Sequence, residues 1–333
     1  MNPNEKRPSP SEAHRSHYKR SSISKSPEDA HQKRLALDHQ LRKQHREQLV
    51  TAKRFRKVDA VAITGDEEEP EYDLSQQELE KIRHKLKNAD HEIRIRGLKQ
   101  LNIYLVDPPA TVKEFVIKGD CVDVLMQFIS GTDPEEQLQA TWCITNLAGG
   151  PAEICEKVLP TVPYLISYLD GQNTALQDQA AWAIGNIAAE ADNFREQLRA
   201  NGALLPLSRL LNSADKRLVQ TVCFALSNLA RGPNARINEY FTSGIATQLL
   251  RHLATDDMCE IVSELCWVLT YLTCGDHTFS TALLNDGLAA LLSSRSMLSK
   301  SPGASTLSTF YPIHTFHSNH PPQFYVFVQY VMV

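Results

Sequence analysis

The chain has 333 residues, of which 42% are hydrophobic and 7% aromatic, and its formal net charge is −4. No apolar run reaches the roughly 18–20 residues that a membrane-spanning helix needs, and the first 30 residues are polar and basic, unlike a secretory signal peptide. The seven cysteines form no CxxC pair, and no GxSxG, phosphate-loop or HExxH motif occurs. We therefore expect a non-enzymatic protein with reduced core cysteines, no metal, no cofactor and no membrane span.

Charge divides the chain into a basic arm and an acidic body. Residues 1–58 hold 15 Lys and Arg against 6 Asp and Glu, whereas residues 59–333 hold 20 against 33, so the two parts carry +9 and −13. A basic arm tied to an acidic body is suited to fold back on that body or to bind an acidic partner. The acidic body argues against a protein that binds nucleic acid along its length.

The arm itself has two parts. Residues 1–30 are rich in Ser, Pro and basic residues and cannot bury enough apolar surface to fold, so we predict disorder there. Residues 31–58 lack Gly and Pro and predict a basic helix with a thin apolar stripe. Its marked positions are Arg34, Leu41, Arg42, Lys43, Arg46 and Leu49, followed by the basic cluster Lys53, Arg54, Arg56 and Lys57. This segment is either a solvated helix or localisation patch, or a segment that orders on an acidic solenoid.

An acidic linker, residues 59–75, leads into the first helices. Ser75 begins the sequence Ser-Gln-Gln-Glu, which is typical of a capping box at a helix start. A first, atypical helical pair is predicted over residues 76–106, and Asp107-Pro108-Pro109 ends it. Shorter helices follow over 112–117 and 122–129, before a turn that leads into the first Trp-bearing helix.

The same unit then recurs four times, at spacings of 40, 42 and 43 residues. An aromatic residue is followed four positions later by Asn in three copies and by Tyr in the fourth. The pairs are Trp142 and Asn146, Trp182 and Asn186, Phe224 and Asn228, and Trp267 and Tyr271. Positions two before, two after and five after the aromatic are apolar in every copy. A helical period of about 40–47 residues indicates armadillo or HEAT repeats, which stack into a solenoid.

Residues four apart on a helix share one face, so we predict that each pair points away from the apolar core. In the second copy, Ala180, Ile184 and Ile187 are expected to face the core, opposite Trp182. A Trp on the polar side is a candidate ligand surface. We therefore predict an all-α, armadillo-repeat, right-handed superhelical solenoid of about four to five repeats over residues 76–293, with a concave binding groove.

The repeat pattern stops near residue 293, halfway through a unit and without a polar cap. We predict that residues 294–333 form an irregular, disordered tail, which we interpret as a truncated or alternatively spliced end. His314, His317 and His320 have a metal-like spacing, but a His-rich disordered tail explains them without a metal.

The array and the basic helix together resemble the importin-α (karyopherin-α) family of nuclear import adaptors. The likeness rests on the basic run from Arg34 through Lys57 and on the Trp-x-x-x-Asn pairs, including the variant Trp267 and Tyr271. It covers residues 30–293, and the family has about ten repeats where this chain has four or five. The resemblance implies a truncated member that keeps the family's major signal-binding site and lacks its minor site.

The resemblance also implies partners and sites. Residues 31–58 would bind importin-β, and the groove would bind cargo proteins with Lys/Arg-rich nuclear localisation signals, without direct nucleic-acid binding, in a protein of the cytoplasm and nucleus. The implied cargo-peptide residues are Trp142, Asn146, Trp182, Asn186, Glu190, Phe224, Asn228, Glu264, Trp267 and Tyr271. The implied importin-β contacts are Arg34, Leu41, Arg42, Lys43, Arg46 and Leu49. The cluster Lys53, Arg54, Arg56 and Lys57 matches the family's autoinhibitory signal mimic.

Two departures keep other interpretations open. Phe224 replaces a Trp, so its slot should be shallower, and Gly149 and Gly150 stand where the family has Ser or Thr to hold a lysine. The alternatives are a non-import armadillo scaffold and a divergent importin-β-binding relative without classical cargo. The transmembrane and coiled-coil domain protein 6 family is an example of the second alternative.

Overall fold

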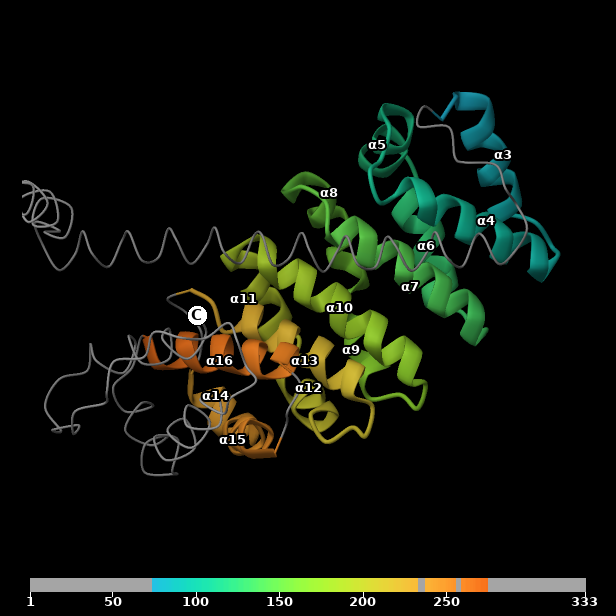
Figure 1. Cartoon of the computed structure of the whole chain (residues 1–333). Coiled ribbons are helices and arrows are strands. Elements are labelled where there is room, and N and C mark those ends of the chain that lie inside the picture. The colour runs from blue at the N-terminus through green and yellow to red at the C-terminus, as the bar shows by residue number, and fades with distance from the viewer. Residues whose placement is uncertain (1–73, 233–236, 256–258, 275–333) are drawn as a thin grey trace, which may run out of the picture. The chain divides into compact units, whose positions relative to one another are not determined.

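The computed structural model describes residues 74–232, 237–255 and 259–274, all within the unit Pro70–Val333. The predicted arm, basic helix and C-terminal tail, together with residues 59–73 of the linker, lie outside the described residues. The described part is helical and contains no strand (Figure 1). Its elements are α3 (Gln76–Leu86), α4 (His91–Tyr104), α5 (Ala110–Ile117), α6 (Cys121–Ile129), α7 (Pro134–Ala148), α8 (Ala152–Lys157), the 3₁₀ turn η1 (Leu159–Thr161), α9 (Val162–Leu169), α10 (Thr174–Glu190), α11 (Asp192–Ala200), α12 (Leu204–Leu210), α13 (Lys216–Leu229), α14 (Ile237–Thr242), α15 (Ile245–Thr255) and α16 (Cys259–Cys274).

Side-chain caps fix where several of the longer helices begin. At α3, Glu78 N donates to Ser75 Oγ at 3.3 Å, and Ser75 N donates to Glu78 Oε2 at 2.9 Å, which confirms the predicted capping box. Four further helices begin after a residue whose side chain accepts from the first-turn amides: Asp90, Asp133, Asn173 and Asp215. Each cap satisfies backbone donors that have no partner within the helix, which contributes about 1 kcal/mol.

The long helices form one continuous stack. We call α4, α7, α10, α13 and α16 the ladder helices, because each packs against the next in that order (Figure 1). The shorter helices pack against them, for example α6 on α7 and α9 on α10. Residues Ala180, Ile184 and Ile187 are fully buried, as predicted for the core side of α10. A single apolar core runs through the described array.

Helix α10 is buried more completely than an amphipathic pattern predicts. Ala181, Ala183, Gly185 and Asn186 are buried as well as the core-facing residues, and Trp182 remains only partly exposed. The expectation that Trp182 and Asn186 together point away from the packed interior is therefore wrong for Asn186. The reason is that α10 packs against α7 on one side and α13 on the other, so little of its surface reaches solvent.

Two glycines make the turns between the short helices. Gly202 and Gly244 adopt φ angles of +83° and +76°, a left-handed conformation that glycine adopts without steric penalty. Gly287, which follows the same spacing in the sequence, lies outside the described residues.

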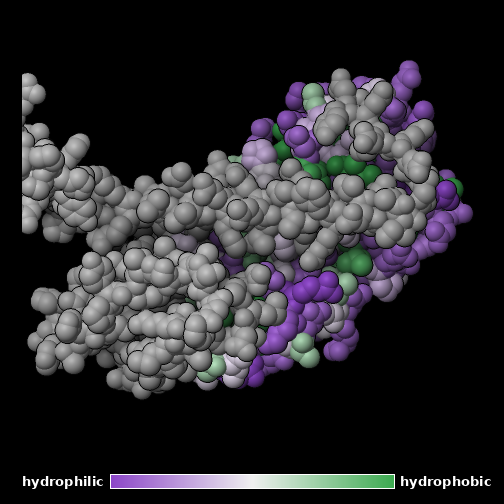
Figure 2. Space-filling model, viewed as in Figure 1, coloured by the Kyte–Doolittle hydropathy of each residue, from purple (hydrophilic) through white to green (hydrophobic). Residues whose placement is uncertain are grey.

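Figure 2 shows mainly hydrophilic residues, with hydrophobic residues in small separated patches, on the face that it displays. Large hydrophobic side chains that are well exposed include Tyr164 and Leu205, at 38% and 49%. None of the described helices is both long and apolar enough to cross a lipid bilayer.

Candidate functional site: an aromatic and asparagine ladder

The predicted aromatic residues lie on successive ladder helices. Trp142 on α7, Trp182 on α10 and Trp267 on α16 are partly exposed, as is Tyr271 one turn further along α16. Phe224 on α13 differs, because it is only 6% exposed. The structure thus brings the aromatic side chains into one series, but it does not leave all of them equally open.

Phe224 fills a space that a glycine creates. A Cβ atom at Gly185 would lie 2.5 Å from Phe224 Cε1, so the phenyl ring rests on the backbone of α10. The ring also packs against Trp182, with centroids 5.6 Å apart and planes inclined by 42°. The predicted shallow slot is therefore occupied by the ring itself. Trp267 and Tyr271 form a second aromatic pair, with centroids 6.1 Å apart.

The asparagines connect one ladder helix to the preceding one. Asn186 Nδ2 donates to the carbonyl oxygen of Thr145 at 3.0 Å, and Asn228 Nδ2 donates to that of Gly185 at 3.2 Å. Both side chains are buried, at 2% and 5% exposed. The Oδ1 atom of Asn186 is buried without a hydrogen-bond partner. A buried acceptor in this state gains from any N–H that a ligand brings to it.

A further asparagine belongs to the same series and was not predicted from the sequence. Asn102 on α4 is 2% exposed, and Asn146 Nδ2 donates to its Oδ1. Asn102 precedes Asn146 by 44 residues, close to the repeat spacing, which is the signal that could have revealed it. Leu98 occupies the aromatic position of this copy, so a search for aromatic and Asn pairs does not find it. We call Asn102, Asn146, Asn186 and Asn228 the rung asparagines.

The two predicted acidic residues have different environments. Glu190 ends α10 and is partly exposed. Glu264 is 3% exposed, and its Oε2 accepts a hydrogen bond from Ser227 Oγ at 2.9 Å. The placement of Glu264 therefore ties α16 to α13, whereas Glu190 is the better placed of the two to meet a ligand.

Comparison with known proteins shows the fold and a likeness to importin-α subunits. The Armadillo/beta-catenin-like repeat model matches residues 159–189, which include Trp182 and Asn186. A designed armadillo repeat protein solved in complex with the peptide (KR)4 superposes with a TM-score of 0.63 at 21% identity, covering 77% of this chain and all of that one. Importin subunit alpha-9 of Arabidopsis thaliana is 33% identical over 278 residues, which are 78% of this chain. Importin subunit alpha-2 of Oryza sativa is 40% identical over 184 residues, or 54% of this chain.

The matches support an importin-α family armadillo protein. These matches confirm the predicted all-α armadillo solenoid and the predicted resemblance. The chain spans only part of its curated importin-α relatives, 53% of the first and 35% of the second.

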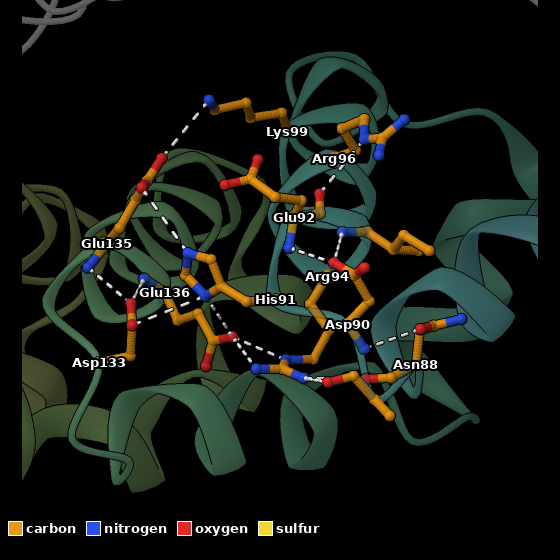
Figure 3. A network of polar contacts seen from close by, with 12 residues as sticks. Asn88, Asp90, His91, Glu92, Arg94, Arg96, Lys99, Asp133, Glu135 and Glu136 are labelled. Carbon is orange, nitrogen blue, oxygen red and sulfur yellow. Dashed lines mark hydrogen bonds and ion pairs between the residues drawn. The ribbon is translucent and has the colours of Figure 1, made fainter.

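An ion-pair network joins α4 and α7, the first two ladder helices (Figure 3). Glu136, on α7, accepts from Arg94 Nε of α4 at 2.6 Å, and its Oε1 lies 3.3 Å from His91 Nδ1. Arg94 also donates to the carbonyl oxygens of Asn88 and Ala89. The side chains of Glu136 and Arg94 are 12% and 24% exposed, so their ion pair is partly shielded from solvent. This charge-assisted hydrogen bond holds α4 against α7.

Two buried arginines donate hydrogen bonds to carbonyl groups near the C-termini of the ladder helices α10 and α13. Arg195 Nη1 donates to the carbonyl oxygen of Ala188 in α10, and Arg199 Nη1 donates to that of Leu229 in α13, both at 2.6 Å. Cations at helix C-termini are favourable because the last carbonyl groups lack partners within the helix. Within the described residues, no group of three His, Cys, Asp or Glu could hold a metal ion.

Proposed function

We propose that this importin-α family protein is a nuclear import adaptor, which binds Lys/Arg-rich localisation signals of cargo proteins along its ladder helices. The observation that carries the proposal is the series of aromatic side chains on successive ladder helices, partly exposed on α7, α10 and α16 and buried on α13, with a rung asparagine one turn beyond the aromatic on α7, α10 and α13. The curated relatives are named as importin-α subunits, and a structural neighbour of the same fold binds a peptide of alternating Lys and Arg.

The chemistry of the ladder suits an extended basic peptide. Aliphatic stems of Lys and Arg pack against indole faces, and the cationic ends gain about 0.5–2 kcal/mol from the ring electrons. Trp142 and Trp182 are exposed enough to provide such faces. The rung amides offer hydrogen bonds to the peptide main chain, and Glu190 supplies negative charge at the end of α10, eight residues beyond Trp182. Glu264, Trp267 and Tyr271 extend the proposed site onto α16.

The proposed slots are not equivalent. Phe224 is packed over Gly185, so we propose that the strongest lysine contacts are made at Trp142 and Trp182. Gly149 and Gly150 leave the end of this groove without the hydroxyl groups expected of the family. This chain is therefore proposed to discriminate less sharply at the first lysine than a relative that has those groups.

The link to transport is proposed to lie in the arm. The basic helix over 31–58 would bind importin-β, with charged contacts from Arg42, Lys43 and Arg46 among its marked positions. The cluster Lys53 to Lys57 would occupy the groove until importin-β captures the arm, because the arm and the body carry opposite charge. An adaptor of this kind passes between the cytoplasm and the nucleus and carries out no chemistry on its cargo.

A binding experiment tests the groove. A fluorescently labelled lysine-rich peptide is titrated with the full chain and with Trp142→Ala and Trp182→Ala, and anisotropy gives the Kd. Each substitution is expected to weaken binding about tenfold, because it removes an apolar and cation–π contact. Tyr164→Ala is the matched control, since Tyr164 is an exposed aromatic residue on α9, outside the ladder helices.

Each outcome of this experiment has a distinct meaning. Weaker binding by both Trp variants with an unchanged Kd for the control supports the proposal. Absence of peptide binding both by the full chain and after removal of residues 1–58, combined with capture of importin-β by the wild type that Arg42→Glu plus Lys43→Glu abolishes, points to the relative without classical cargo. Absence of both activities contradicts the adaptor function and favours the scaffold.

A further inference from the structure

The hydrogen bonds of Asn146 differ from those of Asn186 and Asn228. We call the contact between Asn146 and Asn102 the first rung, and the contact made by Asn186 the second. Asn186 and Asn228 each donate to one backbone carbonyl of the preceding helix, at Thr145 and Gly185 respectively. Asn146 instead donates from Nδ2 to the side-chain oxygen Oδ1 of Asn102, and the carbonyl oxygen of Asn102 lies 3.5 Å from the same nitrogen. In the described ladder, this is the rung at which a side chain orients the amide.

The number of donors explains why this difference matters. A carboxamide has two N–H donors and one carbonyl acceptor. At Asn146 the nitrogen serves two acceptors, both on Asn102. At Asn186 the nitrogen serves one carbonyl, and the oxygen Oδ1 is buried without a partner. The amide of Asn146 is therefore held through its nitrogen and keeps its oxygen for a further hydrogen bond, whereas the amide of Asn186 is enclosed.

The surroundings of Asn146 make this oxygen relevant to binding. Among the four rung asparagines of the described ladder, Asn146 alone is partly exposed, while Asn102 is 2% exposed. Gly149 follows on the same helix end and is exposed, and a Cβ atom there would lie 3.3 Å from the main-chain oxygen of Asn146 and 3.5 Å from Asn186 Nδ2. The missing side chain at Gly149 leaves an approach for the backbone of a peptide between the first two rungs.

We propose that Asn102 is a positioning residue for peptide binding, which holds the amide of Asn146 so that its oxygen accepts a main-chain N–H of the ligand. This inference rests on the proposed function of the groove as a peptide site. Its consequence is a specificity rule. The ligand residue that faces the first rung must carry a backbone N–H, so proline and N-methylated residues are rejected there, whatever the neighbouring lysines contribute.

The test uses the full chain and a labelled peptide of four lysines flanked by alanines. A set of matched peptides replaces one backbone amide at a time by an ester, which removes a single N–H. For the wild type, an ester at the position facing the first rung is expected to weaken binding about tenfold, the effect of one lost hydrogen bond to a buried network. Asn146→Ala identifies that position, because the ester there no longer has an effect.

Two substitutions at Asn102 then separate positioning from folding. Asn102→Leu keeps the size of the side chain but removes the acceptor, and the loss caused by the ester is expected to fall below about threefold. Asn102→Asp keeps an acceptor for Asn146 Nδ2, so the tenfold loss is expected to return. Thermal unfolding of each variant is measured in parallel, and Asn102→Ala replaces the Leu variant if that one does not fold.

The outcomes distinguish this inference from the proposed function. An ester loss of equal size in the wild type and in Asn102→Leu overturns the positioning role, as does its disappearance in Asn102→Asp. A wild type that binds the peptide but tolerates the ester at every position overturns it too. A wild type that does not bind the unmodified peptide contradicts the function of the groove itself, and the positioning role falls with it.

Discussion

Replacement of Gly185 by Ala tests how closely α13 approaches α10. The new Cβ atom would lie 2.5 and 2.7 Å from two carbon atoms of the Phe224 ring and 3.2 Å from Ala225 Cα. Favourable contacts between carbon atoms lie near 3.5–4.0 Å, so the ring must move by about 1 Å and the backbone of α13 must also yield. Overpacking of this kind costs about 1–3 kcal/mol, whereas Ala in a helix gains about 1 kcal/mol over Gly.

The two ring contacts are the shortest and set most of the cost, and the backbone of α13 adds to it because a backbone cannot rotate away as a side chain can. We therefore expect Gly185→Ala to lower the free energy of unfolding by about 1–2 kcal/mol, measured by urea unfolding followed by circular dichroism. The Trp182 ring packs on Phe224, so the fluorescence of the folded protein should change as well. Gly185→Ala is then combined with Phe224→Leu, which shortens the side chain that meets the new methyl group.

The double-mutant cycle is the decisive measurement. If the ring is the obstacle, Gly185→Ala costs less in the Phe224→Leu background than in the wild type, by about 1 kcal/mol. A Gly185→Ala variant as stable as the wild type, or an additive cycle, would refute the account of the α10 and α13 contact.

Three further predictions concern the first repeats. Asp133→Ala removes the N-cap of α7 and should lower the free energy of unfolding by about 1 kcal/mol, and an unchanged urea midpoint would contradict this. Glu136→Gln removes the charge that Arg94 contacts and should cost about 1–2 kcal/mol in the same assay, with no effect expected if the network contributes nothing. Burial would raise the pKa of Asp120, but the nearby Arg83 guanidinium, a backbone hydrogen bond and Lys87 outweigh it and lower that pKa. The carboxylate is thus favoured in the folded state, so its contribution is present at neutral pH and is lost as the pH falls below about 4. Asp120→Asn should flatten the acid side of the stability profile relative to the wild type.

The sequence alone determined the helices, the repeat spacing and the position of each aromatic residue along its helix. These features depend on local rules, namely the 3.6-residue period, side-chain caps such as Ser75, and the glycine turn at Gly202. The family resemblance followed from them, because the spacing of Trp and Asn was readable without a structure. The arm and its importin-β contacts stay predictions, since they lie outside the described residues.

Only the tertiary structure decided which of those residues face a ligand. The environment of a side chain in a solenoid is set by a neighbouring helix about 40 residues away, which no pattern within one helix reports. The absence of a side chain at Gly185 lets the Phe224 ring pack in the interior, and α7 covers Asn186. Asn102 accepts a hydrogen bond from the amide of Asn146. The series of aromatic and Asn pairs is therefore a ladder of unequal rungs, and the inequality arises from contacts between repeats.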